Sequence, residues 1–185
     1  MDHRDRRADD VLAETDHLRF VNRSGWSYVQ RTTASGVVCI VARTRDDRVV
    51  LIEQYRPPVD RHVIELPAGL SGDLVDQADE PLDVAAKREL LEETGYRAER
   101  LRQRAVVASS AGLTDEVVTM FVADGLKKVA PGGGDDSENI SVHEVALHEV
   151  EDWLNRAQAS GKLVDARVFV GLYLLQREGA GGEQT

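Results

Sequence analysis

The sequence predicts an α/β fold: a mixed β-sheet sandwiched between α-helices, with an N-terminal β segment in front of it. Stretches rich in valine and isoleucine alternate along the chain with stretches of helical periodicity. Some neighbouring strand stretches are separated only by a short polar turn, which indicates hairpins and therefore antiparallel pairs. A chain that combines hairpins with helical connections favours a mixed sheet flanked by helices.

The strands are expected at the valine- and isoleucine-rich stretches. Residues 17–35 alternate only intermittently, with Trp26, Tyr28 and Val29 as strand positions. Stronger strand patterns follow at 36–44, 48–56, 62–66, 104–110, 117–123 and 140–150. The polar sequence RDD between the first two of these predicts a hairpin turn. Two prolines end the second strand, because proline cannot continue a hydrogen-bonded ladder.

Three helices are expected, at 81–95, 149–161 and 165–178. The first of them has the clearest signals at its ends. Pro81 suits the first helical turn, and Asp79 or Glu80 can cap it. Gly95 suits the left-handed backbone position that follows the last turn.

The length of 185 residues suits one globular domain with short appendages. We divide the chain into a flexible N-terminal segment (1–16), an N-terminal strand region (17–35), a main domain (36–178) and a flexible tail (179–185). The main domain is long enough to bury a substantial core.

Charge and cysteine content exclude several classes of function. The formal net charge of -10 argues against nonspecific nucleic-acid binding and against docking on an anionic membrane. Cys39 is the only cysteine and lies in an apolar run, so we expect a buried core residue in a reducing compartment. No apolar run reaches membrane-spanning length, and the first residues lack the apolar core of a signal peptide. We therefore expect a cytoplasmic protein.

Three glutamates crowd into the last turns of the first expected helix, at Glu89, Glu92 and Glu93. On a helical wheel Glu89 and Glu93 lie within about 20° of the direction of Leu82, so they continue an apolar stripe. Two carboxylates about 5 Å apart repel each other by roughly 3 kcal/mol at an effective dielectric constant near 20. A hard divalent cation would remove this penalty, which indicates a metal site. A solvated acidic face with weak ion pairs is the alternative.

The stretch around these glutamates resembles the Nudix box, G-x5-E-x7-R-E-U-x-E-E-x-G-U, in which U is apolar. The positions that match in register are Glu80, Arg88, Glu89, Leu90, Glu92, Glu93 and Gly95. The opening glycine does not match, because Leu74 stands at its position. The nearest upstream glycine is Gly69, which indicates an insertion of about five residues in the loop before the helix.

Further stretches resemble the branch of this family that contains ADP-ribose pyrophosphatases and nucleoside-diphosphate-sugar hydrolases. They are VLIEQYRPPV with VIELPAGL, SSAGLTDEVVTMFVA, and ENISVHEVALHEVEDWL with GKLVDARVFVGLYLL. The similarity runs from about Asn22 to about Gln176. It implies a Nudix-type fold for the main domain and a hydrolase that cleaves a diphosphate between a nucleoside and a sugar.

The resemblance leaves the substrate open. The leading hypothesis is Mg²⁺-dependent hydrolysis of ADP-ribose to AMP and ribose 5-phosphate. Another nucleotide sugar, such as GDP-mannose, is a near alternative, since Ser110-Ala111-Gly112 stands where the ADP-ribose group of this branch often has Ser-Pro-Gly. A non-catalytic ADP-ribose sensor is an alternative of another class. The intact glutamates of the box speak against the sensor.

The resemblance also implies roles for the residues of the box. Glu89 and Glu93 would bind Mg²⁺, or Mn²⁺ in its place, together with the backbone carbonyl of Ala68. Glu92 would assist them, and Arg88 would orient a carboxylate of the box. The cation would neutralise the diphosphate and lower the pKa of a bound water.

Residues outside the box complete the expected site. Arg56 could clamp a phosphate as a planar fork, with a surface arginine as the alternative. Trp26 could stack on a purine or pack at a subunit contact. Glu116 is a weaker candidate for substrate binding, with an exposed loop acid as the alternative. Glu138 is the expected general base, and Asp136 is the other candidate.

The last implication of the resemblance is the assembly. It implies a homodimer whose N-terminal strands, within residues 17–35, help to build the site of the partner. The expected small-molecule partner is a nucleotide sugar.

Overall fold

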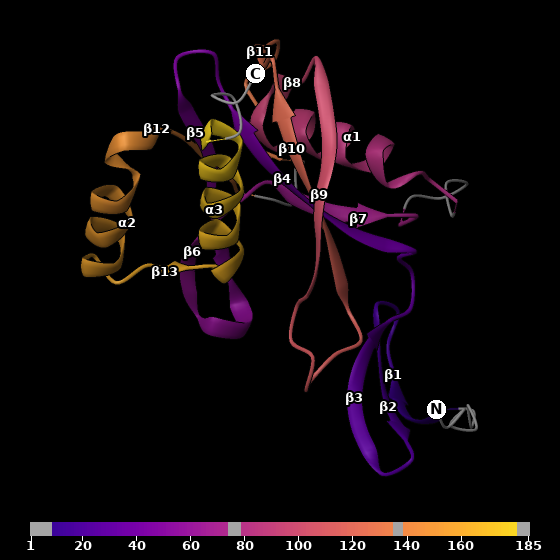
Figure 1. Cartoon of the computed structure of the whole chain (residues 1–185). Helices are drawn as coiled ribbons and strands as arrows, with labels where there is room; N and C mark the ends of the chain where they lie inside the picture. The colour runs from indigo at the N-terminus through magenta and orange to yellow at the C-terminus, as the bar shows by residue number, and fades with distance from the viewer. Residues whose placement is uncertain (1–8, 74–78, 135–138, 181–185) are drawn as a thin grey trace.

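The computed structural model describes residues 9–73, 79–134 and 139–180 (Figure 1). Its largest element is a mixed sheet of eight strands. The strands are β4 (Gly36–Arg43), β5 (Arg48–Arg56), β6 (Arg61–Glu65), β7 (Ala68–Ser71), β9 (Arg100–Ala108), β10 (Val117–Asp124), β12 (Ser141–Ala146) and β13 (Leu163–Val164). β10 runs parallel to β4 and β13 runs parallel to β6, whereas the other pairs are antiparallel. The predicted mixed sheet is confirmed.

The sheet divides into two parts where β4 and β5 diverge. β4 pairs with β5 only at Ala42 and Arg43, next to the turn that joins the two strands. The other half of β4 pairs with β7, while the far half of β5 pairs with β6. The short connection between β6 and β7, Leu66 and Pro67, therefore spans the opening between the two parts.

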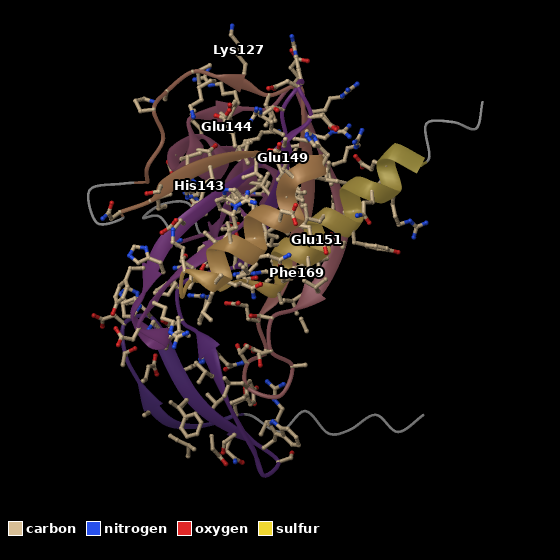
Figure 2. All side chains as sticks on the ribbon, turned by 90° about the vertical axis from the view of Figure 1, so that its left-hand side faces the viewer. Lys127, His143, Glu144, Glu149, Glu151 and Phe169 are labelled. Carbon is tan, nitrogen blue, oxygen red and sulfur yellow. The ribbon has the colours of Figure 1, made fainter. Side chains whose placement is uncertain are left out.

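Helices cover both faces of the sheet, as the sequence predicts. They are α1 (Leu82–Thr94), α2 (Val150–Ala159) and α3 (Ala166–Ala180). Figure 1 shows α1 on one side of the sheet and α2 and α3 on the other. On the outer side of the two-helix layer, Glu151 and Phe169 point away from the core (Figure 2).

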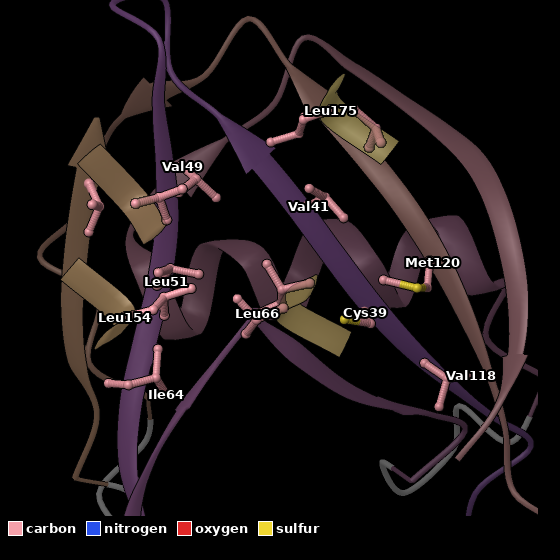
Figure 3. Packing of buried hydrophobic residues seen from close by; sticks show 14 of the residues in the cluster. Cys39, Val41, Val49, Leu51, Ile64, Leu66, Val118, Met120, Leu154 and Leu175 are labelled. Carbon is pink, nitrogen blue, oxygen red and sulfur yellow. The ribbon is translucent and has the colours of Figure 1, made fainter. Parts of the chain in front are cut away.

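Alternating side chains of β4 supply the two hydrophobic cores. Val37, Cys39 and Val41 belong to the core beneath α2 and α3, part of which Figure 3 shows. Val38 and Ile40 belong to the core beneath α1. A strand buried on both faces reads as a continuous apolar run, which is the pattern GVVCIVA. Cys39 is fully buried, as expected.

The ends of α1 agree with the prediction only in part. Gly95 has a φ of 74° and its amide donates to Leu91 O, so it caps the helix in the left-handed conformation. Pro81, expected inside the first turn, precedes the helix as its N-cap residue, and no side chain caps that end. The expected capping group Glu80 instead binds Arg88 with its carboxylate.

A small antiparallel sheet precedes the main domain and projects from it (Figure 1). It consists of β1 (Asp10–Glu14), β2 (Leu18–Arg23) and β3 (Trp26–Arg31). We call it the N-terminal arm. β1 lies within the segment that we expected to be flexible. It forms a strand because its backbone pairs with β2, although all its side chains are exposed.

The remaining elements are short. They are β8 (Tyr96–Arg97) paired with β11 (Lys127–Lys128), and 3-10 turns at Pro57–Val59 and Leu147–Glu149. α3 extends to Ala180, so it includes the first two residues of the expected tail. Among the described helices, none is long and apolar enough to cross a membrane.

Candidate active site

A cleft of about 760 Å³ opens where the two parts of the main sheet diverge. Its wall contains six carboxylates, which belong to Glu65, Asp73, Glu89, Glu92, Glu116 and Asp165. It also contains four guanidinium groups, which belong to Arg31, Arg56, Arg88 and Arg167. The cleft therefore brings together side chains from β3, β5, β6, α1, the β9–β10 connection and the start of α3.

Glu89 and Glu93 of α1 converge on the backbone of β7. The Glu93 carboxylate accepts a hydrogen bond of 2.9 Å from the Ala68 amide, and only 3% of this residue is exposed. Gly69 lies so close to Glu89 that a Cβ atom at position 69 would overlap its carboxyl group. The structure thus brings Ala68, Glu89 and Glu93 together. Gly69 is needed here because it has no side chain.

Arg88 joins Glu80, Glu89 and Glu92 into one network. Its Nη1 donates to Glu89 at 2.9 Å and to Glu92 at 3.2 Å. Its Nε and Nη2 donate to the two oxygens of Glu80, and Nη2 also donates to Leu70 O. Arg88 therefore holds several carboxylates of the box in place.

The carboxyl group of Glu89 is perturbed by its surroundings. Burial raises its pKa from 4.5 to about 7, and Glu92 and Asp73 act in the same direction. Arg88 opposes them by favouring the charged form. A buried carboxyl group with two acidic neighbours is poorly neutralised by one arginine, and a bound cation would favour its ionised form.

The donors around Ala68 and Gly69 fit a hard divalent cation. The Glu89 carboxyl group fills the side-chain space at Gly69, and the Glu93 carboxylate binds the neighbouring Ala68 amide, so carboxylate oxygens for a small ion lie along this strand. Within residues 9–73, 79–134 and 139–180, no three acidic, histidine or cysteine side chains form a complete ligand set. Mg²⁺ usually retains several water ligands and needs only one or two protein carboxylates.

Two arginine–carboxylate pairs occupy another part of the cleft wall. Arg56 binds Glu65 through Nε at 2.9 Å and Nη2 at 2.6 Å. Arg167 binds Asp165 in the same manner, at 2.8 and 2.7 Å. Glu65 therefore holds Arg56. Asp165 and Arg167 were not predicted, although an acid at the start of a predicted helix is an N-terminal capping signal.

Glu116 and Trp26 lie where the N-terminal arm meets the β9–β10 connection. Glu116 lines the cleft and forms an ion pair with Arg31 of β3 at 2.6 Å. Trp26 does not line the described cleft; it is 64% exposed, and its Nε1 lies 3.3 Å from Gly112 O. A stack on a base would therefore require an arm in another position or a second subunit.

The candidates for the general base, Glu138 and Asp136, lie outside the described residues, as do Leu74 and most of the loop insertion. The chain that leads to them is described. Gly133 and Gly134 donate backbone hydrogen bonds to Glu93 O and Glu92 O. The segment before the candidate bases is thus joined to α1, the helix that carries Glu89, Glu92 and Glu93.

The fold and the cleft define a class of protein. The family model for the NUDIX domain matches residues 32–167, so the chain belongs to this family. The predicted family and the Nudix-type fold are confirmed, and the chain is a Nudix hydrolase. Nudix hydrolases generally use divalent metal ions, which agrees with the donors around Ala68.

Two relatives and one solved structure show which members of the family this chain resembles. The chain is 32% identical to the methanol dehydrogenase activator of Bacillus methanolicus over 146 residues, 78% of this chain and 74% of the relative. It is 33% identical to the ADP-ribose pyrophosphatase of Bacillus subtilis (strain 168) over 142 residues, 76% and 72% of the two chains. A crystal structure of an ADP compounds hydrolase shares the fold, with a TM-score of 0.71, 22% identity and coverage of 96% and 95%.

Proposed function

We propose that this protein hydrolyses the diphosphate of ADP-ribose to AMP and ribose 5-phosphate. The observation that carries the proposal is the convergence of two carboxylates on the Ala68–Gly69 backbone: that of the buried Glu93, and that of Glu89, which lines a cleft that also presents arginines. Similarity to an ADP-ribose pyrophosphatase over three quarters of the chain supports the choice of substrate.

The charge of the cleft supports Mg²⁺ as the cofactor, with Mn²⁺ as a possible substitute. Among the residues that the structure describes, six carboxylates of the wall exceed its four guanidinium groups, so this part of the wall would repel a diphosphate. One divalent cation would balance this excess. Mg²⁺ suits the site because it prefers oxygen ligands and shares its coordination with substrate phosphates. Held by Glu89, Glu93 and the Ala68 carbonyl, the ion would neutralise the diphosphate and lower the pKa of a bound water.

The side chains of the cleft supply the positioning. Arg56 and Arg167 each use two nitrogens on a carboxylate, which fixes the plane of the guanidinium group and leaves Nη1 for a phosphate oxygen. Arg88 bridges Glu89 and Glu92 through Nη1 and so orients both carboxylates. Glu138 is the proposed general base, with Asp136 as the alternative. In phosphoryl chemistry such positioning and electrostatic stabilisation account for most of the rate enhancement.

The test is a panel of nucleotide sugars incubated with Mg²⁺ and then with a phosphatase. AMP and ribose 5-phosphate release phosphate under these conditions, whereas intact ADP-ribose does not. We expect ADP-ribose to be turned over with the highest kcat/KM. Preferred turnover of GDP-mannose would change the proposed substrate, while the proposed reaction, hydrolysis of a diphosphate, would stand. Tight ADP-ribose binding with no turnover of any substrate would contradict the hydrolase and indicate an ADP-ribose sensor.

A matched pair of variants tests the metal site. Glu93→Gln should lower kcat by at least about 100-fold, because a neutral amide is a poor ligand for Mg²⁺. It should also abolish the rise in Tm that we expect when Mg²⁺ is added to the wild type. Glu151→Gln, on the exposed side of α2, should change neither quantity. Full activity of Glu93→Gln would contradict the role of Glu93.

We also propose a homodimer in the cytoplasm. The N-terminal arm exposes an unusual number of large apolar side chains for so small a sheet: Val11, Leu12, Leu18, Phe20 and Trp26. Exposed apolar groups that gather in this way mark interaction surfaces, and a second copy of the chain would cover them. A single, fully buried cysteine suits the reducing cytoplasm.

A further inference from the structure

Two glycines meet at the C-terminal end of α1. Gly95 caps the helix, and Gly132 comes from the segment after β11; both have positive φ angles, 74° and 75°. A Cβ atom on Gly132 would lie 2.7 Å from Gly95 N, closer than real Cβ contacts allow. A Cβ atom on Gly95 would in turn lie 2.7 Å from the carbonyl carbon of Ala130. The two backbones are thus in contact with no room for a side chain.

Hydrogen bonds join the same two segments. We call residues Val129–Gly134 the C-cap loop. The amides of Gly133 and Gly134 donate to Glu93 O at 2.8 Å and to Glu92 O at 3.2 Å. The amides of Val129 and Ala130 donate to Gly95 O at 2.9 and 3.2 Å. The loop therefore satisfies carbonyl groups of the last helical turn that an isolated helix would leave unpaired.

The last turn of α1 has a special need for such support. Helix ends fray, and the final carbonyls normally bond to water. In α1, this turn carries Glu92 and Glu93, so fraying would move both carboxylates relative to Ala68. A displacement of about 1 Å in a catalytic group can lower the rate about 100-fold.

We propose that the C-cap loop positions the carboxylates of Glu92 and Glu93, and that cation binding and the loop stabilise each other. Gly132 is the positioning residue on the loop side, because a side chain there would overlap the backbone of Thr94 and Gly95 and push the loop away from the helix end. The inference rests on the proposed hydrolase and its metal site. It adds that a segment far from the Nudix box in sequence sets the metal affinity of the box.

Gly132→Ala tests the inference against a matched glycine. Gly161 has a φ of 92°, and a Cβ atom there would have no neighbour within 4 Å. Gly161→Ala therefore introduces the same backbone strain without the overlap. We expect Gly132→Ala to lower kcat 10-fold to 100-fold and to raise the Mg²⁺ concentration for half-maximal activity, with a smaller change in KM for ADP-ribose. Equal behaviour of the two variants would overturn the inference.

Hydrogen exchange of the wild type provides a test that needs neither turnover nor a stable variant. The Ala68 amide reports on the Glu93 carboxylate, to which it donates. The amides of Gly133 and Gly134 report on the C-cap loop, and the Gly161 amide, bonded to Gln158 O, serves as a control. With MgCl₂, compared with KCl at equal ionic strength, we expect slower exchange at Ala68, Gly133 and Gly134 but not at Gly161.

The two proposals fail in different ways. Protection of Ala68 by Mg²⁺ without protection of Gly133 and Gly134 would refute the coupling and leave the hydrolase intact. Protection of all three amides in a protein that turns over no nucleotide sugar would support the coupling and refute the proposed function. If Gly132→Ala does not fold, the exchange experiment alone decides.

Discussion

Burial makes Glu89 the residue whose protonation should matter most near neutral pH. Its pKa in the folded, metal-free protein is about 7, compared with 4.5 as its ordinary value. Between these values the folded state binds a proton that the unfolded state has lost, so stability falls as pH rises through this window. The shift corresponds to a loss on the order of 3 kcal/mol from pH 4.5 to above pH 7. Urea unfolding in EDTA at a series of pH values measures it.

Glu89→Gln should flatten this pH dependence, because the amide does not titrate. The variant should consequently be more stable than the wild type at pH 8 without metal. Glu151→Gln, exposed on α2, is the control and should retain the slope of the wild type. An unchanged slope in Glu89→Gln would assign the effect to another group.

The geometry of Arg56 predicts that lysine cannot replace it. Its guanidinium group binds Glu65 with two nitrogens and still offers a third, whereas an ammonium group is a point charge that cannot do both. We expect Arg56→Lys to raise KM for ADP-ribose about 10-fold, equivalent to about 1.4 kcal/mol of binding energy. Steady-state kinetics with Arg45→Lys, an exposed arginine, as the control would show this. A KM within twofold of the wild type would remove Arg56 from substrate binding.

Site residues that lie together because of their spacing along one helix could be predicted from the sequence. Site residues that are brought together only by the packing of distant segments could not. Glu89 and Glu93 stand out because their spacing places two acids beside an apolar stripe. Arg167 gives no such signal, since its position in the cleft depends on how α3 packs against the sheet. Gly132 carries no residue-level signal either, because its close contact with Gly95 joins segments far apart in the chain.

At the scale of elements, strands and helices with a buried side were predicted correctly. β4, β5 and β10 are buried on both faces and appear as apolar runs. β1 was missed and β9 begins at Arg100, before the expected start, because both are largely exposed strands with little apolar pattern. β1 forms because its backbone pairs with β2, and β9 extends because its backbone pairs with β10. Sequence periodicity does not reveal such pairing.

The packing of α2 on the sheet predicts a cost for removing its central anchor. Leu154 is 2% exposed and belongs to the core beneath α2 and α3. Leu154→Ala should lower the free energy of unfolding by about 2–5 kcal/mol, since it leaves a cavity in a close-packed core. Chemical denaturation measures this change. Leu113→Ala, the same substitution at a position that is 62% exposed, should cost far less.

At the scale of the whole molecule, the exposed apolar side chains of the N-terminal arm predict self-association. The chain has a mass of 20.4 kDa, so light scattering should give about twice that value for the wild type. Phe20→Asp places a charge on the arm and should convert the dimer to a monomer, because burying an unpaired charge is costly. Val84→Asp, at an exposed position of α1, should leave the mass unchanged. A monomeric wild type would contradict the dimer.

The arm is attached to the cleft through successive residues of two segments. The amide of Val29 donates to Leu113 O, Gln30 contacts Asp115, and Arg31 binds Glu116 in the cleft wall. If ligand binding in the cleft changes the affinity of the arm for a second subunit, then binding of that subunit must change the affinity of the cleft for the ligand by the same factor. Subunits that exchange slowly when loaded with ligand and quickly when empty would be the kinetic signature of this linkage.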